Sequence, residues 1–191
     1  MIQRDGGCDK AVRDRAWNGW LKLKELSGVL CNKRIALKMR RVLYRACVRA
    51  VMMYGCESWP IKKDNKDTLV RAERRMIRMM CGVTLANREN SKDLLERIGL
   101  VDEIVVGVKK ARLRWFGHVF RRNVDVGVKR AFQFKLGDNV GRGRPKRTWY
   151  EVVRNDMRDL NICERDALDR RTWRSAIRNI PANPRSQGKR Q

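Results

Sequence analysis

Apolar residues recur at intervals of three and four along most of this 191-residue chain, which is the pattern of amphipathic helices. The first such segment covers residues 10–27 and ends in a stop signal at Ser27 and Gly28. Its apolar side carries Val12, Ala16, Trp20, Leu23 and Leu26. We therefore expect a helix here that buries one face.

The clearest helical pattern lies between Asn32, placed to cap a helix, and Gly55, placed to end one. The apolar face is predicted to contain Ile35, Met39, Val42, Leu43, Ala46, Cys47, Ala50, Val51 and Tyr54. The opposite face is predicted to expose Lys33, Arg34, Lys38, Arg41, Arg45 and Arg49. No acidic residue occurs in 33–56, whereas most surface helices mix both signs to gain favourable pairs. Such a cationic face is usually only solvated, but repulsion among these uncompensated positive charges favours an anionic partner.

Pro60 prevents a continuous helix, so a third helix is predicted to start at Asp64 or Asn65 and to run to Cys81. Gly82 closes this helix, and its cationic positions are Arg71, Arg74, Arg75 and Arg78. Its apolar stripe contains Leu69, Ala72, Met76, Ile77 and Met80. Core packing is favoured over a methionine-rich partner groove for this stripe. A short helix capped by Ser91 and ended by Gly99 follows.

The segment from Asp102 to Asn123 predicts a long helix, in which the two acidic residues at its start offset the positive end of the helix dipole. One face should hold Ile104, Val108, Ala111, Trp115 and Val119, with Val105, Arg112, Phe116 and Phe120 beside it. Gly117, inside this helix, predicts the close approach of another backbone. His118 is read as a packed or surface ring rather than a general base, because no partner for it is visible.

The helical period lapses between residues 124 and 147, where a short strand or hairpin arm is predicted at about 128–136 within a basic Gly/Pro linker. Thr148 and Glu151 form a capping box that starts another helix. Apolar positions of the last two helices are Trp149, Val152, Val153, Met157, Leu160, Ala167, Leu168, Trp173, Ala176, Ile177 and Ile180. The chain is thus predicted to be mainly α, a bundle of amphipathic helices. Its divisions are 1–100, 101–123, 124–147, 148–180 and a disordered basic tail, 181–191.

The charge balance changes what this bundle is expected to bind. There are 46 Lys and Arg against 21 Asp and Glu, a formal net charge of +25, which favours phosphate polyanions as partners. No apolar run approaches the roughly 20 residues of a membrane span, and no secretory signal is apparent. An intracellular protein, nuclear or cytoplasmic, with no membrane partner is therefore expected.

Catalytic and metal sites are not predicted. The six cysteines lack zinc-site spacing, a single histidine is present, and Cys47 and Cys81 read as small apolar side chains. No Asp-Asp pair, phosphate-binding loop or activated nucleophile is present, so neither a cofactor nor a small-molecule substrate is expected.

The loop Arg142-Gly143-Arg144-Pro145, followed by Lys146 and Arg147, is similar to the core of a minor-groove-binding AT-hook. Phosphate contact is favoured over groove insertion for it, and a solvated linker is the third alternative.

Several blocks in order, "YGCESW" at 54–59, "RWFGH" at 114–118 and "GRPKRTW" at 143–149, resemble the C-terminal part of the reverse transcriptase of non-LTR (LINE-type) retrotransposons. The resemblance runs from about Trp17 to Arg178. In that family the palm with the catalytic aspartates lies upstream of such a segment. The resemblance therefore implies thumb-side helices and a following basic region, truncated before the palm, that grip template-primer or target duplex.

Both lines of reasoning predict a non-catalytic protein that binds duplex DNA or an RNA–DNA hybrid through phosphate contacts. Two alternatives stay open: the thumb and tail of an active polymerase completed by an upstream palm, and a helical module that docks on protein. Trp20, Trp115, Trp149 and Trp173 are read as core rather than as base-stacking residues. The predicted nucleic-acid contacts are Lys33, Arg34, Lys38, Arg41, Arg45, Arg49, Arg71, Arg74, Arg75, Arg78, Arg112, Arg114, Arg121, Arg122, Arg142, Arg144, Lys146 and Arg147.

Overall fold

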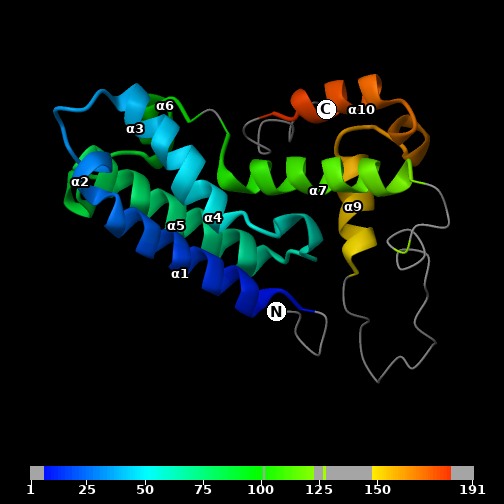
Figure 1. The fold of residues 1–191 in the computed structure, drawn as a ribbon, viewed down its shortest axis with the longest axis horizontal. Helices are drawn as coiled ribbons and strands as arrows, with labels where there is room; N and C mark the ends of the chain where they lie inside the picture. Colours follow the sequence, from blue (N-terminus) through cyan, green and yellow to red (C-terminus); the bar gives the residue numbers. More distant parts are fainter. Residues whose placement is uncertain (1–6, 101, 123–126, 128–147, 182–191) are drawn as a thin grey trace. The chain divides into compact units, whose positions relative to one another are not determined.

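The computed structural model describes residues 7–100, 102–122, 127 and 148–181, and these residues are mainly α-helical, as predicted (Figure 1). The predicted strand at 128–136 and the 124–147 linker lie outside the described residues, apart from Gly127, and so does the tail beyond Pro181. The chain divides into two compact units. Unit 1 comprises Met1–Cys56, Ile61–Val108 and Pro181–Gln191; unit 2 comprises Glu57–Pro60 and Lys109–Ile180.

Unit 1 is built around two long helices, α1 (Asp9–Glu25) and α5 (Lys63–Cys81), which pack against each other. Between them in the chain come α2 (Ser27–Leu30), α3 (Leu37–Leu43), a π-helical turn η1 (Tyr44–Arg49) and α4 (Ala50–Met52). The short turns η2 (Cys56–Ser58) and η3 (Leu85–Asn87) flank α5. The helix α6 (Ser91–Ile98) and the first turn of α7 (Ile104–Phe120) complete the unit.

The apolar stripe predicted for α5 is confirmed, because Leu69, Ala72, Met76, Ile77 and Met80 are all buried. The methionines therefore pack in the core. Gly19 of α1 allows the side chain of Met52 in α4 to lie close to the backbone of α1, because a Cβ at position 19 would lie 3.0 Å from the sulfur of Met52. The core predicted for α1 is also confirmed at Val12, Ala16 and Leu23.

The face predicted to be buried in residues 32–55 is wrong in part. Met39, Val42 and Tyr54 are 62, 54 and 69% exposed, while Arg40, Tyr44, Val48, Arg49 and Met52 are buried. The buried positions around the π-helical turn at Tyr44–Arg49, which are Arg40, Tyr44, Val48 and Met52, recur every fourth residue, whereas the prediction assumed a constant period of 3.6 residues. Arg40 and Arg49 are also buried on this face, and their guanidinium groups bind the Met80 carbonyl and the Glu73 carboxylate.

Unit 2 contains the remainder of α7, α9 (Trp149–Arg158), the turn η4 (Glu164–Ala167) and α10 (Arg170–Arg178). Leu113, Val153 and Ile177 are buried in its core. Phe116 contacts the ring of Trp173 with centroids 5.9 Å apart. Leu168, predicted to be apolar core, is 62% exposed.

Gly117 does mark a close approach, but to a side chain rather than to a backbone. A Cβ at this position would lie 2.6 Å from Cδ1 of Trp173, whose indole N–H donates to the Leu113 carbonyl at 2.9 Å. The tryptophan of α10 thus lies directly against the backbone of α7.

Helix ends were predicted with mixed success. The capping box of Thr148 and Glu151 is confirmed, and Gly82 and Gly99 end their helices in the left-handed conformation, with φ of 67° and 76°. The predicted N-caps Asn32, Asp64 or Asn65, and Ser91 are wrong, because the N-cap positions are Ala36, Lys62 and Asn90. Asn90 accepts the Lys92 N–H at 3.1 Å, so a capping side chain lies one residue earlier than predicted.

Candidate nucleic-acid interface

The predicted contacts divide into three groups. Those with exposed side chains are Lys33, Arg34, Lys38, Arg45, Arg71, Arg75, Arg114 and Arg122. Those that turn toward protein groups are Arg41, Arg49, Arg74, Arg78, Arg112 and Arg121. Arg142, Arg144, Lys146 and Arg147 lie outside the described residues.

Arg49, predicted to be exposed, and Arg112, predicted to contact nucleic acid, are both buried, so these two predictions are wrong. In unit 1, Nε of Arg49 lies 3.1 Å from the carboxylate of Glu73, and its Nη2 donates to the carbonyl of Asp102. In unit 2, Nε and Nη2 of Arg112 donate to Oδ2 of Asp156 at 2.8 and 2.6 Å. A buried charge needs a carboxylate partner of this kind. Amino-acid composition does not reveal which arginines have one.

Glu73 organises the interior of unit 1. One carboxylate oxygen accepts the backbone N–H of Ile104 at 2.8 Å and so serves the first turn of α7. The hydroxyl of Tyr44 donates to the other oxygen at 3.4 Å. Burial raises the pKa of Glu73 and outweighs the lowering effect of Arg49, and burial also raises the pKa of Tyr44. These groups hold the helices in place and are not open to a ligand.

Other arginines bind backbone carbonyls at helix ends and turns. Arg41 donates to the carbonyl of Gly99 at 3.1 Å, and Arg78 donates to that of Glu89 at 2.8 Å. Arg121, in unit 2, donates to the carbonyl of Ala167 at 2.6 Å. Carbonyls at helix C-termini lack intrahelical partners, and the forked guanidinium supplies the missing donors. Part of the cationic excess is therefore structural.

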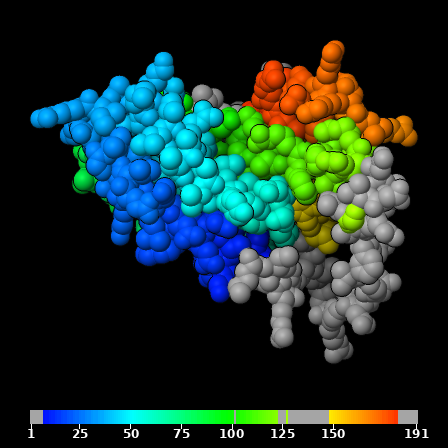
Figure 2. Space-filling model, in the orientation of Figure 1, coloured from blue at the N-terminus to red at the C-terminus, as the bar shows by residue number. Residues whose placement is uncertain are grey.

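Four exposed cations lie in or beside α3, and we call them the α3 cation set. Lys33 and Arg34 precede the helix, Lys38 lies within it and Arg45 follows it in η1. Among the described residues no carboxylate pairs with any of them. Side chains of the segment before α3, in light blue, project from the surface in Figure 2. Exposed cations without counter-charges are what an anionic partner would neutralise.

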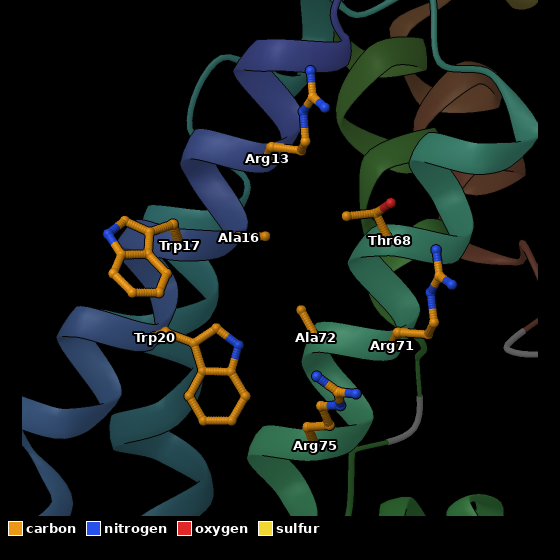
Figure 3. Close-up of a pocket in the computed structure, with 8 residues that line it drawn as sticks. All are labelled: Arg13, Ala16, Trp17, Trp20, Thr68, Arg71, Ala72 and Arg75. Carbon is orange, nitrogen blue, oxygen red and sulfur yellow. The ribbon is translucent and has the colours of Figure 1, made fainter.

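A groove between α1 and α5 holds further cations that face aromatic rings (Figure 3). It has a volume of about 370 Å³ and is lined by Arg13, Ala16, Trp17, Trp20, Thr68, Arg71, Ala72 and Arg75. Trp17 is 60% exposed, and Ala16 and Ala72 are buried between the two walls. We call this site the tryptophan–arginine groove.

Sequence reasoning predicted two of the arginines of this groove, Arg71 and Arg75, but missed Arg13 and Trp17. It also placed Trp20 in the core, whereas this ring is only half-buried and lines the groove. A signal was present, because Arg13, Trp17 and Trp20 stand at i, i+4 and i+7 and therefore share one helix face. Of the other tryptophans, Trp173 is core as predicted, while Trp115 is 38% exposed.

The described residues include no cluster of His, Cys, Asp and Glu that could hold a metal ion. The ring of His118 is exposed, stacks on Trp115 with centroids 5.6 Å apart, and lies 3.4 Å from a guanidinium nitrogen of Arg122. No helix in the described part of the chain is both long and apolar enough to span a bilayer.

The fold and its surface define a mainly helical protein with two compact units, a set of exposed cations and a groove of mixed aromatic and cationic character. Comparison with protein-family models, with curated proteins and with solved structures finds no match for this chain.

Proposed function

We propose that this protein binds nucleic acid through phosphate contacts, with little preference for base sequence. The observation that carries the proposal is the α3 cation set. Its members are exposed, with Lys33 and Arg34 in the turn before α3, Lys38 in α3 and Arg45 in η1, and no carboxylate among the described residues neutralises them. Exposed lysine and arginine side chains bind the sugar-phosphate backbone and carry no direct sequence readout.

The resemblance to LINE-type reverse transcriptases supports the same proposal. A thumb must hold a template-primer duplex that moves past it, and this requires contacts that do not depend on base identity. We therefore propose duplex DNA or an RNA–DNA hybrid as the partner and binding, rather than catalysis, as the role of this chain.

The test measures binding of a fluorescently labelled duplex by anisotropy over a series of salt concentrations. Each phosphate contact should contribute about −0.9 to the slope of log K against log salt. Neutralising the set in one variant, Lys33→Gln, Arg34→Gln, Lys38→Gln and Arg45→Gln, should make that slope shallower by about 0.9 for each phosphate that is no longer bound. Duplexes of unrelated sequence should give the same affinity.

A matched control removes equal charge from the exposed face of α10 through Arg170→Gln, Arg171→Gln, Arg174→Gln and Arg178→Gln. Because this control changes the net charge equally, it separates a defined binding surface from bulk attraction. Equal decreases in affinity for both variants would reject the α3 cation set as the site. An affinity that stays flat as salt rises would reject phosphate binding itself.

A further inference from the structure

The tryptophan–arginine groove lies on two packed helices, so its walls are held in place before any ligand arrives. Val12 and Ala16 of α1 and Leu69 and Ala72 of α5 are buried beneath it. Above this base, Trp20 extends from α1 toward Arg71 and Arg75 of α5, while the ring of Trp17 projects from the outer side of α1 (Figure 3). Because alanines form the floor, bulky side chains line only the sides of the groove.

Three guanidinium groups line this groove without counter-charges. Among the described residues no carboxylate pairs with Arg13, Arg71 or Arg75. Nε of Arg71 donates to a backbone carbonyl, that of Asp67, at 3.2 Å, which leaves its charge unneutralised. Repulsion among three cations in one small groove is relieved when an anion enters, so the ligand should carry negative charge.

The indole rings place a second requirement on the ligand. Trp17 is 60% exposed and Trp20 is half-buried, and neither indole N–H has a hydrogen-bond partner among the described residues. A large flat surface beside guanidinium groups suits a planar ring that is joined to an anion. Aromatic residues along a cationic groove are how proteins hold unpaired bases.

The size of the groove argues against a duplex at this position. A volume of about 370 Å³ is that of a small-ligand site and suits a nucleotide or two. In a duplex, moreover, each base is already stacked between its neighbours, so its face is not available to an indole ring. Unlike a duplex, an unpaired strand offers both phosphates and free base faces.

We propose that the tryptophan–arginine groove binds single-stranded nucleic acid, with an unpaired base stacked on Trp17 or Trp20 and its phosphates held by Arg13, Arg71 and Arg75. This inference rests on the proposed function and deepens it. The α3 cation set grips the backbone of a duplex, while the groove holds a strand that has left the duplex.

The experiment compares a labelled oligothymidine and a labelled duplex on wild type and on the variant Trp17→Ala with Trp20→Ala. Loss of base stacking should weaken oligothymidine binding about 5- to 160-fold, since stacking is worth about 1–3 kcal/mol per base. Duplex affinity should change less than about 2-fold, because the α3 cation set is left intact. Arg13→Gln with Arg71→Gln and Arg75→Gln should lower the salt dependence of oligothymidine binding by about 0.7 for each phosphate that is no longer bound.

Two further variants keep the outcome interpretable. Trp17→Phe with Trp20→Phe retains flat rings and should preserve most of the oligothymidine affinity, and circular dichroism checks that both double variants fold. Trp115→Ala, which removes another exposed indole, should leave binding unchanged.

Three results would overturn the groove proposal. Oligothymidine binding could prove insensitive to the Trp17→Ala and Trp20→Ala change, or duplex binding could fall equally with it. Thymidine monophosphate could also compete as well as the oligonucleotide does, which would make the groove a mononucleotide site. In each case duplex binding by wild type would leave the proposed function intact, whereas wild type that binds no nucleic acid would refute both proposals.

Discussion

Replacing Asp156 with alanine should destabilise unit 2 strongly, because it would leave a buried guanidinium without its counter-charge. Arg112 is 1% exposed and uses two nitrogens, at 2.8 and 2.6 Å, on the same carboxylate oxygen of Asp156. Its third donor, Nη1, reaches the carbonyl of Trp59 at 3.2 Å. The other oxygen of Asp156 lies 3.8 Å from Nζ of Lys109, which pairs more closely with Asp159, at 2.9 Å.

The magnitude follows from burial. Removing one partner of a buried ion pair costs about 3–5 kcal/mol, mostly the penalty of the charge left behind. Replacing both partners with apolar residues of similar size is often neutral or stabilising, because no charge is then desolvated. Asp156→Ala should therefore lower the free energy of unfolding by about 3–5 kcal/mol, whereas Arg112→Met with Asp156→Leu should recover most of that stability.

Urea unfolding followed by tryptophan fluorescence and circular dichroism measures both variants. The folded double variant should also bind duplex DNA with unchanged affinity, since Arg112 is enclosed and has no access to phosphate. A destabilisation below about 1 kcal/mol for Asp156→Ala would show that Arg112 is solvated and would refute the burial argument. Reduced duplex binding by a stable double variant would make Arg112 a nucleic-acid contact after all.

The remaining predictions concern helix packing, pH and capping. Gly117→Ala should lower the free energy of unfolding by about 1–2 kcal/mol, because the added methyl group would clash with the buried ring of Trp173. This loss should exceed the gain of about 1 kcal/mol in helix propensity. Unchanged thermal stability would contradict the prediction. Burial raises the pKa of Glu73, so its protonated form stabilises the fold at low pH and this contribution is lost as pH rises through the raised pKa. The stability of wild type relative to Glu73→Gln should therefore fall with rising pH in urea titrations, and an increase would mean that ion pairing outweighs burial. Thr148→Ala should cost about 1 kcal/mol through loss of the hydrogen bond from the Glu151 N–H to the Thr148 hydroxyl, measured by thermal unfolding.

Helix type and much of the core could be predicted because a regular period carries that information. The stripe of α5 follows the α-helical period from Leu69 to Met80, and all its predicted members are buried. The stripe through α3, η1 and α4 could not be predicted in the same way. The prediction assumed a period of 3.6 residues throughout, whereas the buried positions Arg40, Tyr44, Val48 and Met52 recur every fourth residue across the π-helical turn. The predicted stripe therefore includes Met39 and Val42, which are more than half exposed.

The candidate site was predictable only in kind. The charge of the chain indicated an anionic partner, but the roles of neighbouring arginines depend on tertiary contacts. Arg45 is exposed, while Arg49, one turn later, is buried against Glu73. Both carry the same side chain in an equally basic stretch, and a carboxylate 24 residues further along the chain decides between them. The tryptophan–arginine groove likewise needs two helices side by side, which no single-helix pattern shows.

Arg40 illustrates a separate consequence of these buried guanidinium groups. Its Nη1 donates to the carbonyl of Met80 at 2.7 Å and to that of Leu30 at 3.4 Å, and so ties the ends of α5 and α2 together. A lysine ammonium is a compact charge on a flexible stem and has no planar fork with which to span such acceptors. A version of this protein with every arginine changed to lysine would keep its formal charge of +25 and its long-range attraction for polyanions. It would nevertheless lose the guanidinium hydrogen bonds that join its helix ends, so the same net charge would not preserve the same fold.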